Sequence, residues 1–135
     1  MSSKIKFGNK EKHLSKSKEL QTDKCISFNF RYLSDKSYSD CKDISFFIKY
    51  LERLSKLSSI SWKQAQQSDR HGFGFETLGV ESIKVALPAV VTEDVKKLLV
   101  FRATGDNHAF LGLREDDVFN VIFIESQFGD IYNHS

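Results

Sequence analysis

The sequence predicts an α+β fold, in which a twisted antiparallel sheet carries a helical hairpin packed on one face. Three observations predict it: an alternating segment around residue 28, a helical period after it, and consecutive strand-like segments from residue 98 onward. The predicted order of elements is β-α-α-β-β-β, with one further strand possible on either side. A chain of 135 residues with 40% hydrophobic residues and twelve Phe is large enough for a single core.

The start of the chain differs in composition from the rest. Residues 1–24 hold seven Lys and three acids, a net charge of +4, whereas residues 25–135 hold 13 basic and 15 acidic side chains, a net of −2. We therefore expect residues 1–23 to form a basic, flexible leader and residues 24–135 to form one domain. The leader either aids solubility or holds an anionic partner, and the acidic body argues against a broad nucleic-acid-binding surface.

No segment predicts export or insertion into a membrane. The N-terminus lacks the apolar stretch of a secretory signal, and no apolar run approaches the roughly 20 residues of a membrane span. Cys25 and Cys41 are too few for a disulfide scaffold. They are most simply reduced thiols, with a disulfide between them as the alternative. The expected location is the cytoplasm.

The first half of the body predicts a strand and two helices. In KCISFNFRYL, one face of a strand-like alternation holds Ile26, Phe28, Phe30 and Tyr32. The following DISFFIKYLERLSKLSSI has a helical period, with Asp43 as the expected N-cap. Its predicted buried stripe comprises Ile44, Phe47, Ile48, Leu51, Leu54 and Leu57. A short second helix is expected after Ser61, which forms a capping box with Gln64.

The second half predicts a sheet. After the glycines of DRHGFGFETLG, a strand is expected in SIKVAL, residues 82–87, followed by Pro88 and one helical turn. Strands are then expected in LLVFRAT, HAFLGLR and VFNVIFIES, separated by the turn sequences GDN and EDD. The final FGDIYNHS is a candidate edge strand. The predicted core comprises Ile26, Phe28, Phe30, Phe47, Leu51, Leu54, Val121 and Phe123.

The element order and the pattern FRATGDNHAFLGLREDDVFNVIFIES…IYNH resemble RelE/YoeB/HigB-like toxins, which cleave mRNA on the ribosome. The shared features are an Arg before a turn, a Gly-containing strand, an apolar strand and a Tyr/His terminus. The pattern also resembles small prophage proteins that end in a similar meander. The resemblance covers about residues 24–134. It implies a bacterial or prophage toxin or phage-defence effector, with RNA or the ribosome and a cognate antitoxin or other protein as partners.

If the chain is an enzyme, the resemblance implies an endoribonuclease that needs no metal or other cofactor. Basic residues of such toxins hold the scissile phosphate, and the counterparts here are Arg102 and Arg114. His134 or His108 would act as general acid or base, and Tyr132 would donate a proton or stack on a base. Each of these residues also has a structural interpretation, as a solvent-facing member of a strand or as ordinary edge packing.

A second candidate site is DRHGFGFE, residues 69–76. Its Arg70 and His71, next to two Phe residues, could hold a phosphate and stack on a base. We favour the structural interpretation, a helix end at Gly72 followed by a strand that buries Phe73 and Phe75. No pair of Cys or His residues has metal-ligand spacing, so no metal site is predicted.

Two functions from different classes therefore remain. One is an RNA-cleaving toxin, and the other is a non-catalytic interaction module of a prophage or defence system that binds a protein through a sheet edge or the helical hairpin. Convergence of the candidate side chains within about 10 Å would favour the enzyme, because acid–base groups must reach one reacting site. Scatter over both faces of the sheet would favour the interaction module.

Overall fold

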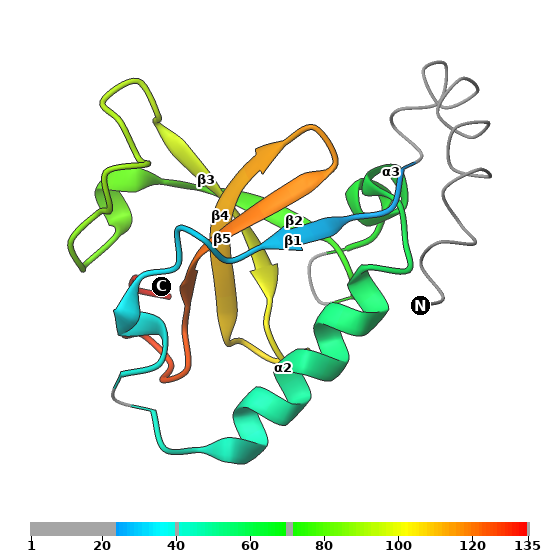
Figure 1. Cartoon of the computed structure of the whole chain (residues 1–135), viewed down its shortest axis with the longest axis horizontal. Coiled ribbons are helices and arrows are strands. Elements are labelled where there is room, and N and C mark those ends of the chain that lie inside the picture. Colours follow the sequence, from blue (N-terminus) through cyan, green and yellow to red (C-terminus); the bar gives the residue numbers. More distant parts are fainter. Residues whose placement is uncertain (1–23, 40, 70–71, 135) are drawn as a thin grey trace, which may run out of the picture.

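The computed structural model describes residues 24–39, 41–69 and 72–134, and the leader expected at residues 1–23 lies outside them. The described residues form an α+β fold with one mixed five-stranded sheet and two helices (Figure 1). The predicted fold class is therefore confirmed. In chain order the elements are β1 Ser27–Asn29, α2 Ile44–Leu57, α3 Trp62–Gln67, β2 Phe75–Gly79, β3 Lys97–Arg102, β4 Ala109–Glu115 and β5 Val118–Ile124.

Strands β2 to β5 form an antiparallel meander, as the sequence predicts. β3 pairs with β2 and β4, and β4 pairs with β5 across a tight turn at Asp116. At one edge, however, β1 runs parallel to β5, with Ser27 opposite Val118. The expectation of a wholly antiparallel sheet is therefore wrong, and the strand order is β1-β5-β4-β3-β2. A parallel pair needs a long crossover, and here the chain between β1 and β5 supplies it.

The strand after the helices begins earlier than predicted. β2 occupies Phe75–Gly79, whereas residues 82–87, predicted as a strand, contribute a single bridge between Ile83 and Tyr132. Phe75 lies opposite Phe101 with ring centroids 5.3 Å apart, so aromatic packing fixes β2 beside β3. The glycine loop is followed by a strand, as the structural interpretation of DRHGFGFE predicts, but α3 ends at Gln67 and not at Gly72. Phe73 lies before β2, and Phe73 and Phe75 are partly and not fully buried. The final segment joins the sheet through the Tyr132 bridge and not as an edge strand.

Both helices begin where the sequence predicts. The Asp43 carboxylate accepts a hydrogen bond from the Phe46 N–H at 3.3 Å and caps α2. At α3 the Ser61 hydroxyl accepts from the Gln64 N–H at 3.0 Å, and the Gln64 side-chain oxygen accepts from the Ser61 N–H at 2.8 Å. These caps satisfy N–H groups that the first turn leaves free. The starts of both helices therefore follow from local sequence.

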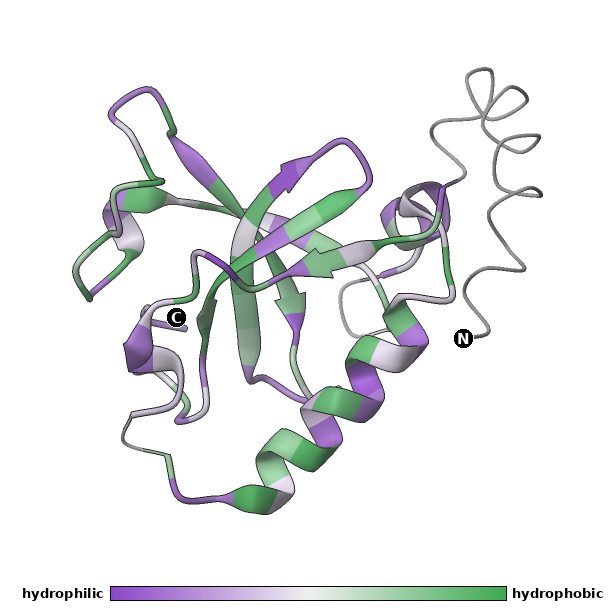
Figure 2. Cartoon of the chain, in the orientation of Figure 1, coloured by the Kyte–Doolittle hydropathy of each residue, from purple (hydrophilic) through white to green (hydrophobic). Residues whose placement is uncertain are grey.

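The buried face of α2 differs from the predicted one. Phe46, Tyr50 and Leu57 are buried, and the Tyr50 ring lies 5.0 Å from that of Phe110. Three members of the predicted stripe are instead exposed: Ile44 at 75%, Ile48 at 57% and Leu51 at 68%. Hydrophobic residues occur along the whole of α2 (Figure 2), so the helical period alone does not single out one face. The two large rings bury more area than Ile or Leu, which explains why they face the sheet.

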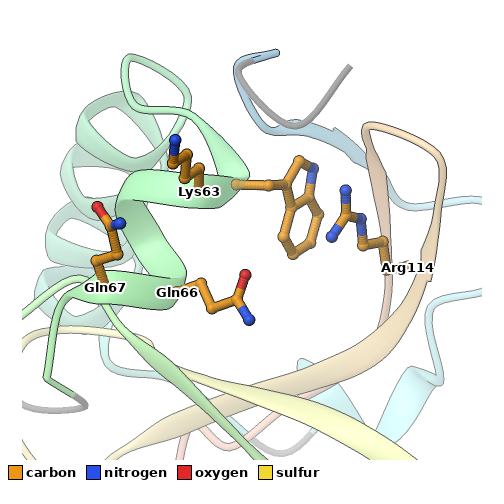
Figure 3. A pocket seen from close by; sticks show the side chains of 5 residues that line it. Lys63, Gln66, Gln67 and Arg114 are labelled. Carbon is orange, nitrogen blue, oxygen red and sulfur yellow. The ribbon is translucent and has the colours of Figure 1, made fainter. Parts of the chain in front are cut away.

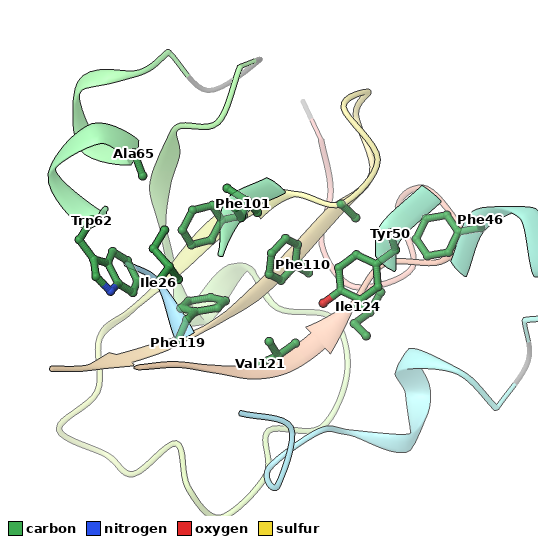
Figure 4. Close-up of a cluster of buried hydrophobic side chains, with 12 residues drawn as sticks. Ile26, Phe46, Tyr50, Trp62, Ala65, Phe101, Phe110, Phe119, Val121 and Ile124 are labelled. Carbon is green, nitrogen blue, oxygen red and sulfur yellow. The ribbon is translucent and has the colours of Figure 1, made fainter. Parts of the chain in front are cut away.

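Both faces of the sheet are packed. The helices cover one face, where the core is built on the rings of Trp62, Phe101, Phe110 and Phe119 (Figure 4). The other face carries a second cluster: Leu98, Val100, Ala109, Leu111, Ile122, Phe123, Ile131 and Tyr132. The predicted core residues divide as follows: Ile26, Val121 and Phe123 are buried, and Phe28, Phe47 and Leu54 are partly buried against the core. The prediction for Phe30 is wrong, because β1 ends before it and leaves it 40% exposed.

Candidate functional site

The last described residues fold back over the sheet face that the helices leave uncovered. After β5 the chain turns at Gly129, whose φ of 86° lies in the left-handed region that favours glycine. Lys84 anchors the returning segment, because its backbone N–H donates to the Ile131 carbonyl at 2.7 Å and its ammonium donates to the Gly129 carbonyl at 2.7 Å. This return buries Tyr132 and brings His134 next to the end of β5.

A buried carboxylate lies at that point. Glu125 directly follows β5 and is fully buried, with its backbone N–H donating to the Ala109 carbonyl at 2.8 Å. Its two carboxylate oxygens lie 2.7 and 2.9 Å from His134 Nε2, and one of them accepts from the Gly129 N–H at 3.1 Å. Burial raises the pKa of Glu125, and the hydrogen bond from His134 opposes this rise. The imidazole is therefore held through one nitrogen by a carboxylate of low solvent access.

Two aromatic rings enclose the His134 imidazole. The Tyr132 ring stacks on it at 4.0 Å between centroids, and the Phe128 ring lies at 4.2 Å. The His134 side chain keeps 12% of its surface exposed, while Phe128 is 51% exposed. Within the described part of the chain, nothing hydrogen-bonds to the second ring nitrogen, Nδ1.

Arg102 and Glu76 extend this arrangement across the sheet. Arg102, at the end of β3, is 6% exposed, and its guanidinium lies 3.4 Å from the Glu76 carboxylate of β2. It also donates to the Asn107 carbonyl at 3.2 Å. Burial and the negative charge of Glu125 raise the pKa of Tyr132, and the positive charge of Arg102 opposes them. We call these five residues the C-terminal cluster: Glu76, Arg102, Glu125, Tyr132 and His134.

A second histidine lies beside the C-terminal cluster. His108 Nδ1 lies 3.0 Å from the Asp106 carboxylate, which also accepts the His108 backbone N–H at 2.9 Å. Burial would raise the pKa of Asp106, but its hydrogen bonds with His108 and Thr104 outweigh that effect and lower it. The His108 ring lies 6.1 Å from the Phe128 ring. Phe128 thus contacts both His108 and His134, each of which bonds a carboxylate.

Arg114 lies elsewhere. It is exposed near the end of β4, with its guanidinium 4.2 Å above the Trp62 ring on the helix-covered face. Ala109, whose carbonyl bonds Glu125, is five residues earlier on the same strand, which separates the two positions by about 17 Å. Arg114 therefore does not contact the C-terminal cluster.

The predicted site residues are thus partly brought together. Tyr132, His134 and Arg102 belong to one cluster, and His108 lies next to it. Arg114 is on the other face, and the candidates Arg70 and His71 lie outside the described residues. Arg102 was predicted to clamp a phosphate, and in the structure its guanidinium contacts the Glu76 carboxylate and the Asn107 carbonyl.

Sequence reasoning missed both carboxylates of the C-terminal cluster. Glu125 directly follows the apolar residues of VFNVIFIES. An acid that continues a strand expected to be buried could have been recognised as a buried carboxylate. Glu76 lies in FGFETLG, where it alternates with Phe75 and Thr77 and looks like an ordinary solvent-facing residue. Its partner Arg102 is 26 residues away in sequence, so only the pairing of β2 with β3 identifies the contact.

Comparison with known proteins does not add to this geometry. No protein-family model, no curated protein and no solved structure matches the chain.

Among the described residues, no helix has the length and apolar character needed to cross a membrane. In the same residues, no three His, Cys, Asp or Glu side chains are grouped as a metal site. Cys25 and Cys41 are both free thiols. The fold and the C-terminal cluster therefore define the protein as an α+β domain with a histidine, His134, bonded to a buried carboxylate.

Proposed function

We propose that the chain is a toxin or phage-defence effector of bacterial or prophage origin that cleaves RNA in the cytoplasm, on or near the ribosome. One observation carries the proposal: His134 and His108 are each bonded to a carboxylate, and their rings lie 4.2 and 6.1 Å from the exposed ring of Phe128. RNA cleavage without a metal needs one group to accept a proton and another to donate one. The exposed aromatic ring near both histidines offers a surface on which a base stacks.

In the proposed reaction, the 2′-hydroxyl of one nucleotide attacks the adjacent phosphorus. His134 accepts the hydroxyl proton at Nδ1, because Glu125 accepts the hydrogen at Nε2 and stabilises the imidazolium that forms. The bond from phosphorus to the 5′-oxygen breaks as His108, in its protonated form, donates to that oxygen. The products are a 2′,3′-cyclic phosphate and a free 5′-hydroxyl, with one proton gained by His134 and one lost by His108.

Tyr132 and Arg102 support His134 in this proposal. The Tyr132 ring stacks on the imidazole and restricts its rotation. The raised pKa of Tyr132 keeps the phenol protonated at neutral pH. Arg102 supplies the positive charge of the cluster and offsets part of the negative charge of Glu125 and Glu76. Both residues therefore act as positioning residues that hold the base in one orientation.

The test uses the full chain with RNA, both alone and with translating ribosomes. We expect cleavage with cyclic phosphate ends, and His134→Ala and His108→Ala should each lower the rate by about 10²–10⁴. Asn133→Ala, which changes an exposed residue next to His134, is the control. A wild-type chain that cuts no RNA under either condition overturns the proposal.

A specific observation also favours the second candidate function, a protein-interaction module. Ile44, Ile48 and Leu51 form an exposed apolar stripe on α2, and such patches often bind a protein. Residues 41–58 hold four basic and two acidic side chains. The matching partner is therefore an apolar segment with acidic flanks, such as that of an antitoxin, and the basic residues 1–24 are a poor match by charge.

Ile48→Ser combined with Leu51→Ser separates the two functions. The substitutions lie on the exposed side of α2 and do not contact the C-terminal cluster, so RNA cleavage should persist. If the stripe binds a protein partner, the double variant should lose it, whereas His134→Ala should retain it. Retention of the partner by the double variant would rule out the stripe as its docking surface.

A further inference from the structure

A pocket of about 440 Å³ lies between α3 and the end of the β4–β5 hairpin (Figure 3). Its volume is within the range of small-molecule sites. It is lined by Trp62, Lys63, Gln66, Gln67 and Arg114. The C-terminal cluster is on the opposite face of the sheet, so this pocket is separate from the proposed cleavage site.

Arg114 is held in place at the mouth of this pocket. Its guanidinium stacks 4.2 Å above the Trp62 ring, and its Nε donates to the Asp116 carbonyl at 2.7 Å. Trp62 is fixed in turn, since its indole N–H donates to the Asp117 carbonyl at 2.9 Å. The stack occupies the flat face of the guanidinium. Its two terminal nitrogens bond to nothing else that the structure describes, so their N–H groups remain available for a ligand.

The chemistry of the lining selects an anion with polar substituents. Lys63 and Arg114 bring two positive charges, and no carboxylate is among the lining residues that the structure describes. A guanidinium offers two parallel N–H groups to phosphate oxygens, and a lysine ammonium adds a point charge. The Gln66 side chain projects into the space between α3 and the strands (Figure 3), and its amide both donates and accepts hydrogen bonds. Such a pair of cations and amides suits a phosphate group attached to a base or sugar.

We propose that this pocket binds a nucleotide, with its phosphate between Arg114 and Lys63 and its base or sugar against Gln66 and Gln67. Binding there does not depend on RNA cleavage, because no residue of the pocket belongs to the C-terminal cluster. The measurement that tests this pocket is the binding of a mononucleotide to the full chain.

The chain contains a single Trp, and it lies in this pocket, so its fluorescence reports binding directly. The experiment titrates the full chain with adenosine monophosphate, adenosine and inorganic phosphate, with calorimetry as a second measurement. We expect a saturable fluorescence change with the monophosphate, none with adenosine, and weaker binding of inorganic phosphate. Raising the salt concentration should weaken binding, since the main contacts are ionic.

Arg114→Gln and Lys63→Gln should each weaken binding of the monophosphate about tenfold or more, the effect of losing a hydrogen bond to a charged group. Arg31→Gln is the matched control, because Arg31 is also exposed and lies 5.9 Å from an aromatic ring, that of Tyr32. Its affinity should equal that of the wild type. Three results would overturn the proposal: no saturable binding by either method, equal losses in the Arg114 and Arg31 variants, or inorganic phosphate binding as tightly as the monophosphate.

Discussion

At the scale of single residues, the contact between Glu125 and His134 decides what the C-terminal segment can do. A fully buried carboxylate is rare unless it is paired, and here its oxygens contact His134 and the Gly129 N–H. A merely structural pair would serve to hold the end of the chain on the sheet. A functional pair would in addition orient an imidazole that keeps some access to solvent.

The raised pKa of Glu125 predicts how stability depends on pH. Between the unfolded value of 4.5 and the higher folded value, the folded state binds more protons at Glu125 than the unfolded chain does. The contribution of Glu125 to the free energy of unfolding is therefore greatest below pH 4.5 and falls as the pH rises through the folded-state pKa. Glu125→Gln removes this titration, so the wild type should lose stability relative to the variant across that window.

Urea unfolding at a series of pH values measures this difference. Glu93→Gln is the control, because Glu93 is exposed and its curve should run parallel to that of the wild type. A Glu125→Gln curve parallel to the wild type across the same window would contradict the prediction. The same variant should also shift the pH profile of RNA cleavage if Glu125 positions His134 as its base.

At the scale of elements, α2 offers two Leu→Ala substitutions with opposite expectations. Leu57 is fully buried and Leu51 is 68% exposed. Leu57→Ala should lower the free energy of unfolding by about 2–5 kcal/mol through lost burial and a cavity. Leu51→Ala should change it by less than about 1 kcal/mol, because the side chain packs against little and Ala favours the helix.

Chemical denaturation of the two variants measures these free energies under the same conditions. Equal losses would mean that Leu51 is covered in solution, for example by a second copy of the chain. In that case the loss at Leu51 should depend on protein concentration, and sedimentation would reveal the oligomer. A smaller loss at Leu57 than at Leu51 would contradict the assigned face of α2.

At the scale of the whole molecule, distant segments close the fold. β1 pairs with β5 near the other end of the chain, and the buried Ser37 hydroxyl accepts from the Ile124 N–H at 2.9 Å. The C-terminal segment then covers the second face of the sheet through Ile131 and Tyr132. Removing the last residues should therefore expose apolar surface of that face.

Residues 1–23 lead to a different expectation. They are polar and rich in Lys and Ser, with too little apolar surface to offset the entropy cost of ordering. Deleting them should leave the melting temperature unchanged, measured by circular dichroism on the shortened and full chains. A drop of several degrees would show that they pack on the fold. Unchanged stability with lost RNA cleavage would identify them as a binding arm.

Much of the fold was predictable because its signals are local. The alternation in VFNVIFIES, the turn sequence EDD, the Asp43 cap and the Ser61–Gln64 capping box each act within a few residues. Tyr132 and His134 could be chosen as candidates from their side-chain chemistry and from the resemblance of the Tyr/His terminus to that of the toxins. Glu125 was missed as their partner, because its neighbours in sequence say nothing of the turn at Gly129 that returns the chain to it.

By itself, the sequence determined the α+β class, the starts of both helices and the three C-terminal strands. Only the tertiary structure decided which face of α2 is buried, that β1 lies parallel to β5, and that Glu125, Tyr132 and His134 meet. The physical reason is that caps, turns and hydrophobic periods act through neighbouring residues. Pairing across the chain depends instead on how much apolar area each competing arrangement buries. On α2 the large rings of Phe46 and Tyr50 are buried, and an equally regular stripe of Ile and Leu is left exposed.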